Sequence, residues 1–399
     1  MTEDISFNKG KYITTLPCGN QCSQKCYSEV SEKDVKEYIS ALISYGYCQS
    51  ESFLKGKNIF VTLTKNNEIL HLSYTAHDSI LRILRDPLLQ TVYTTKGEPF
   101  DKITSTSLSV IPLDYSHREI TDGNGMSFAI TLEDGSYIII DGGYGDYAEN
   151  TFKKSPEDAE ILYDFLKSNN KRKDQKINIT AWIFTHPHAD HYGAFIKFSK
   201  AHSKDVAIKH FIFNHGDPST YAKDYQPNNF LSETIFDIAS EHYANADFIK
   251  PHAGQTLKFC NTELKFFFTQ ELCAPHIAPA VNDSSLVFQI RANNKSALFM
   301  ADCDKTISNL LVKIYGDSLK SDIMQINHHG YSGVTEELFD CVSPKITIWP
   351  TSEETFKKRI TGAPYQYIGN AVSANKYIFD KLGNDGCIVA DKEIKTIQF

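Results

Sequence analysis

The sequence predicts an α/β fold in two parts, a small N-terminal domain over residues 1–105 and a larger domain over residues 106–399. A chain of 399 residues is longer than one average domain. Its composition, with 41% hydrophobic and 23% charged residues, excludes a disordered or low-complexity protein. From about residue 106 to the C-terminus, strand-like and helix-like segments alternate without an internal repeat, which is typical of one large α/β domain.

The N-terminal domain has the pattern of a small mixed α/β unit. A helix is expected to begin after Ser31, because Asp34 completes a capping box, and to end at Gly46. Strands are expected at residues 59–64 and 69–74, and a third apolar run follows at residues 80–84. We find no catalytic pattern in this domain. It is expected to be either a docking module, able to join two copies of the chain into a homo-oligomer, or a packing extension of the larger domain.

The cysteines and the apolar segments bear on where the protein works. Nine cysteines at irregular spacing do not match a secreted disulfide framework, so we expect a cytoplasmic location with reduced thiols. No segment has the roughly 18–20 apolar residues that cross a bilayer, so no membrane partner is expected. Cys18, Cys22 and Cys26 are spaced to share one face of a helix and could bind a metal or an iron–sulfur cluster. The alternative is a chance cluster in a loop or on a buried face.

The charge balance restricts the partners of the protein. With 41 Lys and Arg against 49 Asp and Glu, the formal net charge is −8 at pH 7. This balance gives no basic footprint for duplex nucleic acid. A small-molecule substrate or a short single strand therefore suits the surface better than a duplex.

The larger domain begins with strand-like segments. Residues 108–113 and 126–132 are followed by Asp134-Gly135, which predicts a type I′ hairpin turn into the next strand at residues 137–140. That strand ends at Asp141-Gly142-Gly143, where the glycines allow close approach of the backbone to whatever lies beyond.

The strongest chemical signal follows an alternating strand at residues 177–184. The chain then reads Thr185-His186-Pro187-His188-Ala189-Asp190-His191. Imidazole nitrogens suit zinc and a carboxylate adds negative charge, so this pattern matches two adjacent divalent ions. His186 and His188 point the same way from an extended turn and can bind one ion. Asp190 and His191 stand where the next helix begins and can turn toward the second.

The same segment resembles the HxHxDH signature of the metallo-β-lactamase superfamily. Three further segments resemble motifs of that family: Asp141 in Asp-Gly-Gly, residues 297–302 ending in Asp302, and His328-His329-Gly330 after an apolar run. The resemblance covers roughly residues 107–399. It implies an αββα sandwich, in which two mixed sheets lie back to back with helices outside and the metals at one edge.

The resemblance also implies two divalent ions that share one carboxylate. Zinc is the expected metal, with manganese or iron as alternatives. Most family members place a third histidine on the first ion, but residues 281–287 contain none, and only Asp283 is near. The implied ligands are His186, His188 and Asp302 with water for the first ion, and Asp190, His191, Asp302 and His328 for the second.

The remaining histidines need separate assignments. His328 is preferred to His329 as the ligand, because other branches carry a single histidine followed by an aromatic residue and glycine at this point. His329 then becomes the candidate proton donor, with Tyr331 as the alternative. Residues 214–217 either line the pocket or form a polar turn. Four histidines are expected to be surface or pocket residues rather than ligands: His215, His242, His252 and His276.

The sequence around residues 282–287, combined with His328-His329-Gly330, resembles one branch of the superfamily. That branch includes the soluble domain of DNA-uptake competence channels and bacterial phosphorylcholine esterases, and its members act on phosphodiesters. Competence domains usually have serine where this chain has Tyr331. We expect a metal-dependent hydrolase in which hydroxide held by both ions attacks a small or short single-stranded phosphodiester. The alternatives are an ester, lactone or thioester hydrolase, a di-iron oxidoreductase, and a non-catalytic metal-stabilised binding protein.

Overall fold

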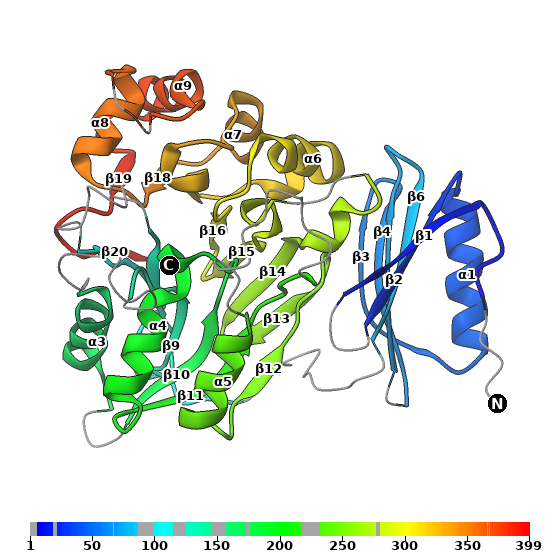
Figure 1. The fold of residues 1–399 in the computed structure, drawn as a ribbon, viewed down its shortest axis with the longest axis horizontal. Helices are drawn as coiled ribbons and strands as arrows, with labels where there is room; N and C mark the ends of the chain where they lie inside the picture. The colour runs from blue at the N-terminus through cyan, green and yellow to red at the C-terminus, as the bar shows by residue number, and fades with distance from the viewer. Residues whose placement is uncertain are drawn as a thin grey trace.

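The chain folds into a three-sheet α/β structure, shown in a computed structural model (Figure 1). A six-stranded sheet belongs to the N-terminal part, and two seven-stranded sheets belong to the larger part. The structure describes residues 6–18, 22–66, 68–86, 99–114, 125–145, 157–172, 176–217, 232–276, 280–364, 366 and 368–399.

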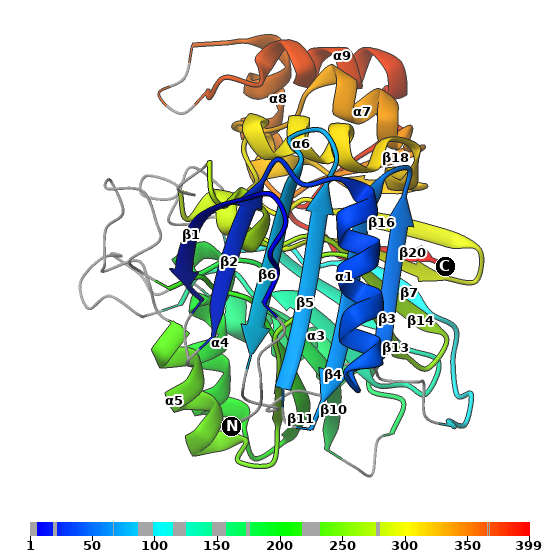
Figure 2. The ribbon, with the colours of Figure 1, turned by 90° about the vertical axis from the view of Figure 1, so that its right-hand side faces the viewer.

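The N-terminal sheet is antiparallel throughout, with the strand order β1-β2-β6-β5-β4-β3. Helix α1 (Glu32–Ser44) crosses one face of this sheet (Figure 2). The predicted capping box is present, because Ser31 Oγ accepts from Asp34 N and the Asp34 carboxylate accepts from Ser31 N. The strands are β1 (Lys11–Pro17), β2 (Ser23–Ser28), β3 (Cys48–Lys55), β4 (Asn58–Lys65), β5 (Glu68–Thr75) and β6 (Ile80–Asp86).

The first seven-stranded sheet is mixed, with the strand order β12-β11-β10-β9-β8-β7-β20. Its strands from β9 to β12 are parallel, whereas β7, β8 and β20 pair antiparallel. The bounds are β7 (Ser107–Val110), β8 (Ser127–Thr131), β9 (Tyr137–Asp141), β10 (Ile177–Ile183), β11 (Val206–Ile212), β12 (Asp247–Ile249) and β20 (Lys395–Gln398).

The second seven-stranded sheet is also mixed and follows the order β13 to β19. Its first four strands pair antiparallel, and the strands from β16 to β19 are parallel. The bounds are β13 (Thr256–Phe259), β14 (Thr262–Phe268), β15 (Val287–Ala292), β16 (Lys295–Phe299), β17 (Ile323–Gln325), β18 (Ile346–Trp349) and β19 (Cys387–Val389).

The two seven-stranded sheets lie face to face around an apolar core. Ile140 and Ile183 of the first sheet share this core with Phe266, Phe288 and Phe299 of the second. Full burial of each such side chain contributes about 1.5–3 kcal/mol. Helices cover the two outer faces (Figure 1): α3 (Asp158–Asn169), α4 (Ala189–His202) and α5 (Ser232–His242) on one, and α6 (Lys305–Tyr315), α7 (Glu336–Val342), α8 (Glu353–Thr361) and α9 (Val372–Leu382) on the other. This layering confirms the predicted αββα sandwich.

The N-terminal sheet packs against the second half of the sandwich through the face opposite α1 (Figure 2). The rings of Phe60 and Tyr315 stack, with centroids 5.6 Å apart. Arg82 is buried and its Nε donates to the carbonyl of Ala274 at 2.6 Å. The boundary near residue 105 and the role of this sheet stay predictions; β6 ends at Asp86 and β7 begins at Ser107.

One local prediction was wrong, and the structure decides between the two alternatives left open for the cysteine cluster. Gly135 has φ +79°, but Asp134 has no positive φ, so the hairpin turn is not type I′. The Asp134 carboxylate instead accepts a hydrogen bond from Ser136 N at 2.9 Å, which fixes a different turn. Cys18 and Cys22 do not share a helix face; they lie at the hairpin between β1 and β2, where Cys18 N donates to Cys22 O at 3.0 Å.

None of the described helices is both long and apolar enough to cross a bilayer.

Candidate metal centre

The predicted motifs meet at one edge of the sandwich, where strands of both sheets end. Asp141 is the last residue of β9, and the His186–His191 segment follows β10 in the same sheet. Asp302 follows β16, and the paired histidines follow β17 in the other sheet. Carboxyl ends of neighbouring parallel strands share an edge, so segments far apart in the sequence come together here.

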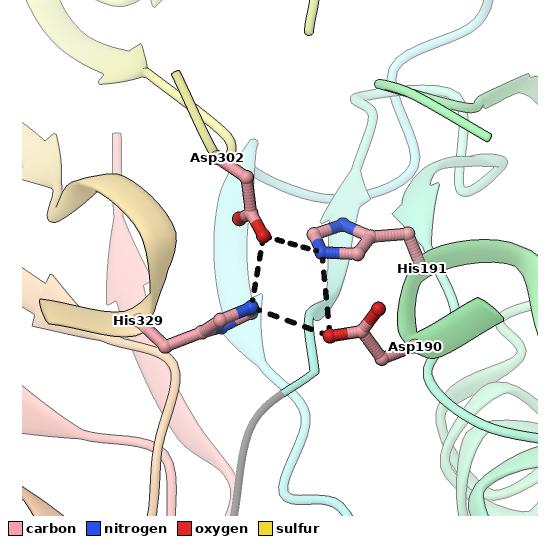
Figure 3. Close-up of side chains that lie close together, drawn as sticks. All are labelled: Asp190, His191, Asp302 and His329. Carbon is pink, nitrogen blue, oxygen red and sulfur yellow. Dashed lines mark ion pairs between the residues drawn. The ribbon is translucent and has the colours of Figure 1, made fainter. Parts of the chain in front are cut away.

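Four side chains form a compact group at this edge: Asp190, His191, Asp302 and His329 (Figure 3). One ligand atom from each lies within 4.8 Å of the others. Asp302 Oδ2 is 3.3 Å from His191 Nε2 and 3.2 Å from His329 Nε2. Asp190 Oδ2 is 3.8 Å from His191 Nε2 and 3.5 Å from His329 Nε2. Two ligand atoms on one tetrahedral zinc ion lie about 3.3 Å apart, so these spacings suit a single ion.

The donor atoms of this group also lack the hydrogen bonds that buried polar atoms normally make. His191 Nε2, His329 Nε2 and Asp302 Oδ1 are buried without a hydrogen-bond partner. Leaving one such atom unsatisfied costs about 1–3 kcal/mol. A divalent ion would satisfy these atoms, so the residues present fit the metal that the fold family implies.

A second set of donors adjoins the first through Asp302. His186 Nε2 lies 3.8 Å from Asp302 Oδ2 and 3.1 Å from His188 Nδ1. His186 is completely buried, and His188 is the N-cap residue of α4. The structure therefore brings together the three protein groups predicted for a first ion, while their role as ligands stays a prediction.

Asp141 supports the centre from behind. Its Oδ2 lies 2.8 Å from His191 Nδ1, and its carboxylate also accepts from Thr185 N and Thr185 Oγ1, both at 2.8 Å. A carboxylate on Nδ1 fixes the imidazole so that Nε2 faces the group. Asp141 is thus an orienting residue for His191.

The charges of the group are strongly coupled. Burial opposes ionisation of Asp302, yet His329, His191 and His328 hold its pKa well below the usual value. Burial also opposes protonation of His191, but the surrounding carboxylates outweigh it and hold the pKa of His191 well above its usual value. The pKa of His329 is raised in the same way. Metal binding at this point must therefore displace protons, so metal affinity should rise with pH.

The imidazoles of the other set behave differently. Burial holds the pKa of His186 well below its usual value and lowers the pKa of His188. Both side chains are therefore neutral near pH 7, with lone pairs available for a metal.

The two paired histidines lie differently with respect to the four-residue group. His329, which the sequence assigned to proton donation, lies in the four-residue group. His328, which the sequence preferred as ligand, lies beside it: its Nε2 is 3.7 Å from Asp302 Oδ2, and its Nδ1 is 2.8 Å from Ser332 Oγ. The cause is the backbone, because two successive left-handed residues turn neighbouring side chains in different directions.

Other predicted site residues lie near the centre but outside the group. Asp283 Oδ1 accepts from Asp304 N at 3.0 Å, so it holds the loop after Asp302. Tyr331 is half-buried, with its ring centroid 5.2 Å from that of His328. The histidines expected not to be ligands also lie outside the group: His215, His242, His252 and His276.

Two residues at the centre, Asn282 and Gln325, were not assigned individual roles from the sequence. Asn282 Nδ2 lies 3.3 Å from His328 Nε2. Gln325 Oε1 accepts from the backbone N–H groups of Met300 and Ala301 and so supports the residues leading to Asp302. Asn282 lies in the segment where most family members have a further metal-binding histidine, and this position could have identified it. For Gln325 the sequence offers no such signal.

The backbone around the centre is strained. Asp141, Ala301, His328 and His329 all have φ between 45° and 56°, a region that costs other residues more than glycine. Such residues cluster where a site constrains the chain.

Comparison with known proteins agrees with this geometry. A family model described as the metallo-beta-lactamase superfamily matches residues 120–345, more than half of the chain. The chain belongs to the metallo-beta-lactamase superfamily. Members of this superfamily are generally metal-dependent hydrolases that bind divalent metals. No curated protein matches the chain.

Solved structures with the metallo-beta-lactamase fold are similar to this member at low sequence identity. The metallo-beta-lactamase fold protein YhfI from Bacillus subtilis is 8% identical to this chain, with a TM-score of 0.44. The match covers 74% of this chain and 100% of that chain. Zn(2+)-bound PqqB from Methylobacterium extorquens is 9% identical with a TM-score of 0.39, over 73% and 100%. Unliganded yeast PDE1 is 12% identical with a TM-score of 0.40, over 74% and 100%.

Proposed function

We propose that this member of the superfamily is a hydrolase that uses two divalent ions, zinc in the first instance, to cleave small or short single-stranded phosphodiesters. The observation that carries the metal part is the convergence of four side chains, three of which are buried and each have an atom that lacks a hydrogen-bond partner. Residues 282–287 and the His-His-Gly segment, which resemble a branch acting on phosphodiesters, support the substrate class. The net charge of −8 favours small or single-stranded substrates over a duplex.

The residues divide the work by position. Asp302 would be shared by both ions, since its Oδ2 faces His186 on one side and His191 with His329 on the other. When bound, the ions supply an activated water and positive charge for the developing oxyanion. Asp141 and Thr185 keep His191 in the orientation that this requires.

His328 is better placed than His329 to meet the substrate. Its side chain is 19% exposed, whereas that of His329 is fully buried. Asn282 Nδ2 donates to His328 Nε2 at 3.3 Å, so the ring hydrogen is on Nδ1, which donates to Ser332 Oγ at 2.8 Å. We propose that His328 lies next to the substrate and that Tyr331 remains the alternative proton donor.

Metal-loaded protein assayed on bis-p-nitrophenyl phosphate and on simple p-nitrophenyl esters tests the proposal. We expect phosphodiester turnover that falls by more than about 10²-fold in His188→Ala and Asp190→Ala, because the charge that stabilises the transition state is lost. His276→Ala, at an exposed position, is the matched control and should keep the wild-type rate.

Each of the other possible results would lead to a different conclusion about the function. Turnover of esters alone would reassign the substrate class. Stoichiometric iron with a visible absorption band would favour the oxidoreductase. Unchanged rates in His188→Ala and Asp190→Ala would remove this centre from catalysis.

A further inference from the structure

The turn that presents His329 has an unfavourable backbone. His328, His329 and Gly330 have φ values of 45°, 56° and 86°, so three successive residues are left-handed. This conformation costs a residue other than glycine roughly 1–2 kcal/mol. It persists only where surrounding groups over-determine it. The contacts of this turn therefore decide where His329 Nε2 points.

Two buried side chains hold the carbonyl groups of this turn. Arg359 Nη1 donates to His329 O at 2.7 Å, and Asn375 Nδ2 donates to Gly330 O at 2.7 Å. Both side chains are completely buried. Arg359 lies in α8 and Asn375 in α9, two helices that follow the segment matched by the family model.

The end of β18 and the residue after it, Trp349 and Pro350, further restrict the conformation of this turn. A Cβ at position 330 would lie 2.9 Å from the ring of Trp349, so the backbone of Gly330 is pressed against that ring. His329 Nδ1 donates to Pro350 O at 3.0 Å, which leaves Nε2 to face Asp190 and Asp302. Ring and backbone of His329 are thus fixed separately, the ring by Pro350 and the backbone by α8 and α9.

We propose that Arg359 and Asn375 are positioning residues that set the metal affinity of the site containing His329. This inference rests on the proposed two-ion centre. Burying a guanidinium costs several kcal/mol, and apolar residues of similar volume are often equally stable in its place. A side chain that only fills space would not need a guanidinium. The hydrogen bond from Arg359 to the carbonyl of the strained turn is explained if it holds the His329 side chain in place.

Arg359→Met and Asn375→Leu remove the donors and keep most of the volume. In each variant we expect the affinity for one of the two ions to fall by about 10–100-fold, the usual effect of losing an outer-shell partner, with the other ion retained. Zn²⁺ affinities are measured by competition with a chromophoric chelator, and Co²⁺ spectra report the geometry of the altered site. Arg359→Lys, which keeps one donor, should restore part of the affinity.

Lys357→Met and Lys376→Met are the matched controls. They lie on the same two helices with side chains 67% and 62% exposed, and should bind both ions as wild type does. Wild-type affinity for both ions in Arg359→Met and Asn375→Leu would overturn the inference, as would equal loss of both ions from a folded variant. If Arg359→Met does not fold, Asn375→Leu decides alone. A wild-type protein without metal affinity would instead overturn the proposed function.

Discussion

Two groups of histidines and carboxylates in the described part of the chain differ in how far their carboxylate oxygens are satisfied by hydrogen bonds. The metal centre is one. The other, here called the interface cluster, consists of His71, Asn214, His252 and Glu271, between the N-terminal sheet and the sandwich. Glu271 accepts from His252 Nδ1 at 3.0 Å, from Asn214 Nδ2 at 2.9 Å and from Thr269 Oγ1 at 2.7 Å.

The comparison shows that residue type alone does not identify a metal site. In the interface cluster both oxygens of the Glu271 carboxylate accept hydrogen bonds. The rings of His252 and His71 stack, with centroids 4.9 Å apart. In the metal centre, Asp302 Oδ1 lacks a partner and Oδ2 faces several imidazole nitrogens. A buried carboxylate whose two oxygens accept hydrogen bonds indicates a structural role, whereas a buried carboxylate oxygen without one, beside several imidazole nitrogens, indicates a cation site.

The largest expected effect comes from Asp302→Asn, which removes the shared charge with little change of shape. Metal content, measured by elemental analysis, should fall for both ions, and hydrolysis should drop by more than about 10²-fold. Retained binding of both ions would contradict the distinction between the two groups.

Glu271→Gln should affect stability and leave the metal unchanged. Replacing one carboxylate oxygen by an NH2 group leaves a buried donor of His252, Asn214 or Thr269 unpaired, which costs about 1–3 kcal/mol. The change is measured by denaturant unfolding of the metal-free protein. Glu160→Gln is the control, because the Glu160 side chain is 44% exposed and contacts His202 at the surface. Its unfolding free energy should stay within about 0.5 kcal/mol of that of the wild type. Loss of metal from a folded Glu271→Gln variant would show that the interface cluster also supports metal binding, and would contradict the distinction between the two groups.

The smallest effect is a pH dependence of the interface cluster. Burial lowers the pKa of His71 to about 3, against about 6.5 in the unfolded chain. The folded chain therefore binds fewer protons, and His71 destabilises it progressively as the pH falls below 6.5. At pH 5.5 the loss is about 1.4 kcal/mol. The unfolding free energy of His71→Gln, compared at pH 7.5 and 5.5, should lack this part; an unaltered pH dependence would exclude His71 as its source.

Features fixed by local chemistry could be predicted from the sequence. The helix after Ser31 begins at its capping box, and the buried strands follow their apolar patterns. The order of Asp141, the HxHxDH segment, Asp302 and the paired histidines identified the superfamily and brought these residues to one edge. Each of these inferences depends on neighbours within a few positions or on a known motif.

Features fixed by distant contacts could not. The choice between His328 and His329 depends on two positive φ angles, which are maintained in part by Arg359, 30 residues further along the chain. The hairpin at Asp134 depends on which donor its carboxylate finds. Glu271 meets the N-terminal sheet through Gln24, which donates to its carbonyl across 247 residues. No spacing in the sequence encodes these encounters.

The division of the centre between the two sheets has a mechanical consequence. Asp190 and His191 come from the first layer, and Asp302 and His329 from the second. A cation bound by all four would cross-link the layers at this edge. Without it, the edge would be held only by the contacts among these four side chains, so occupancy of the site and the spacing of the layers should change together.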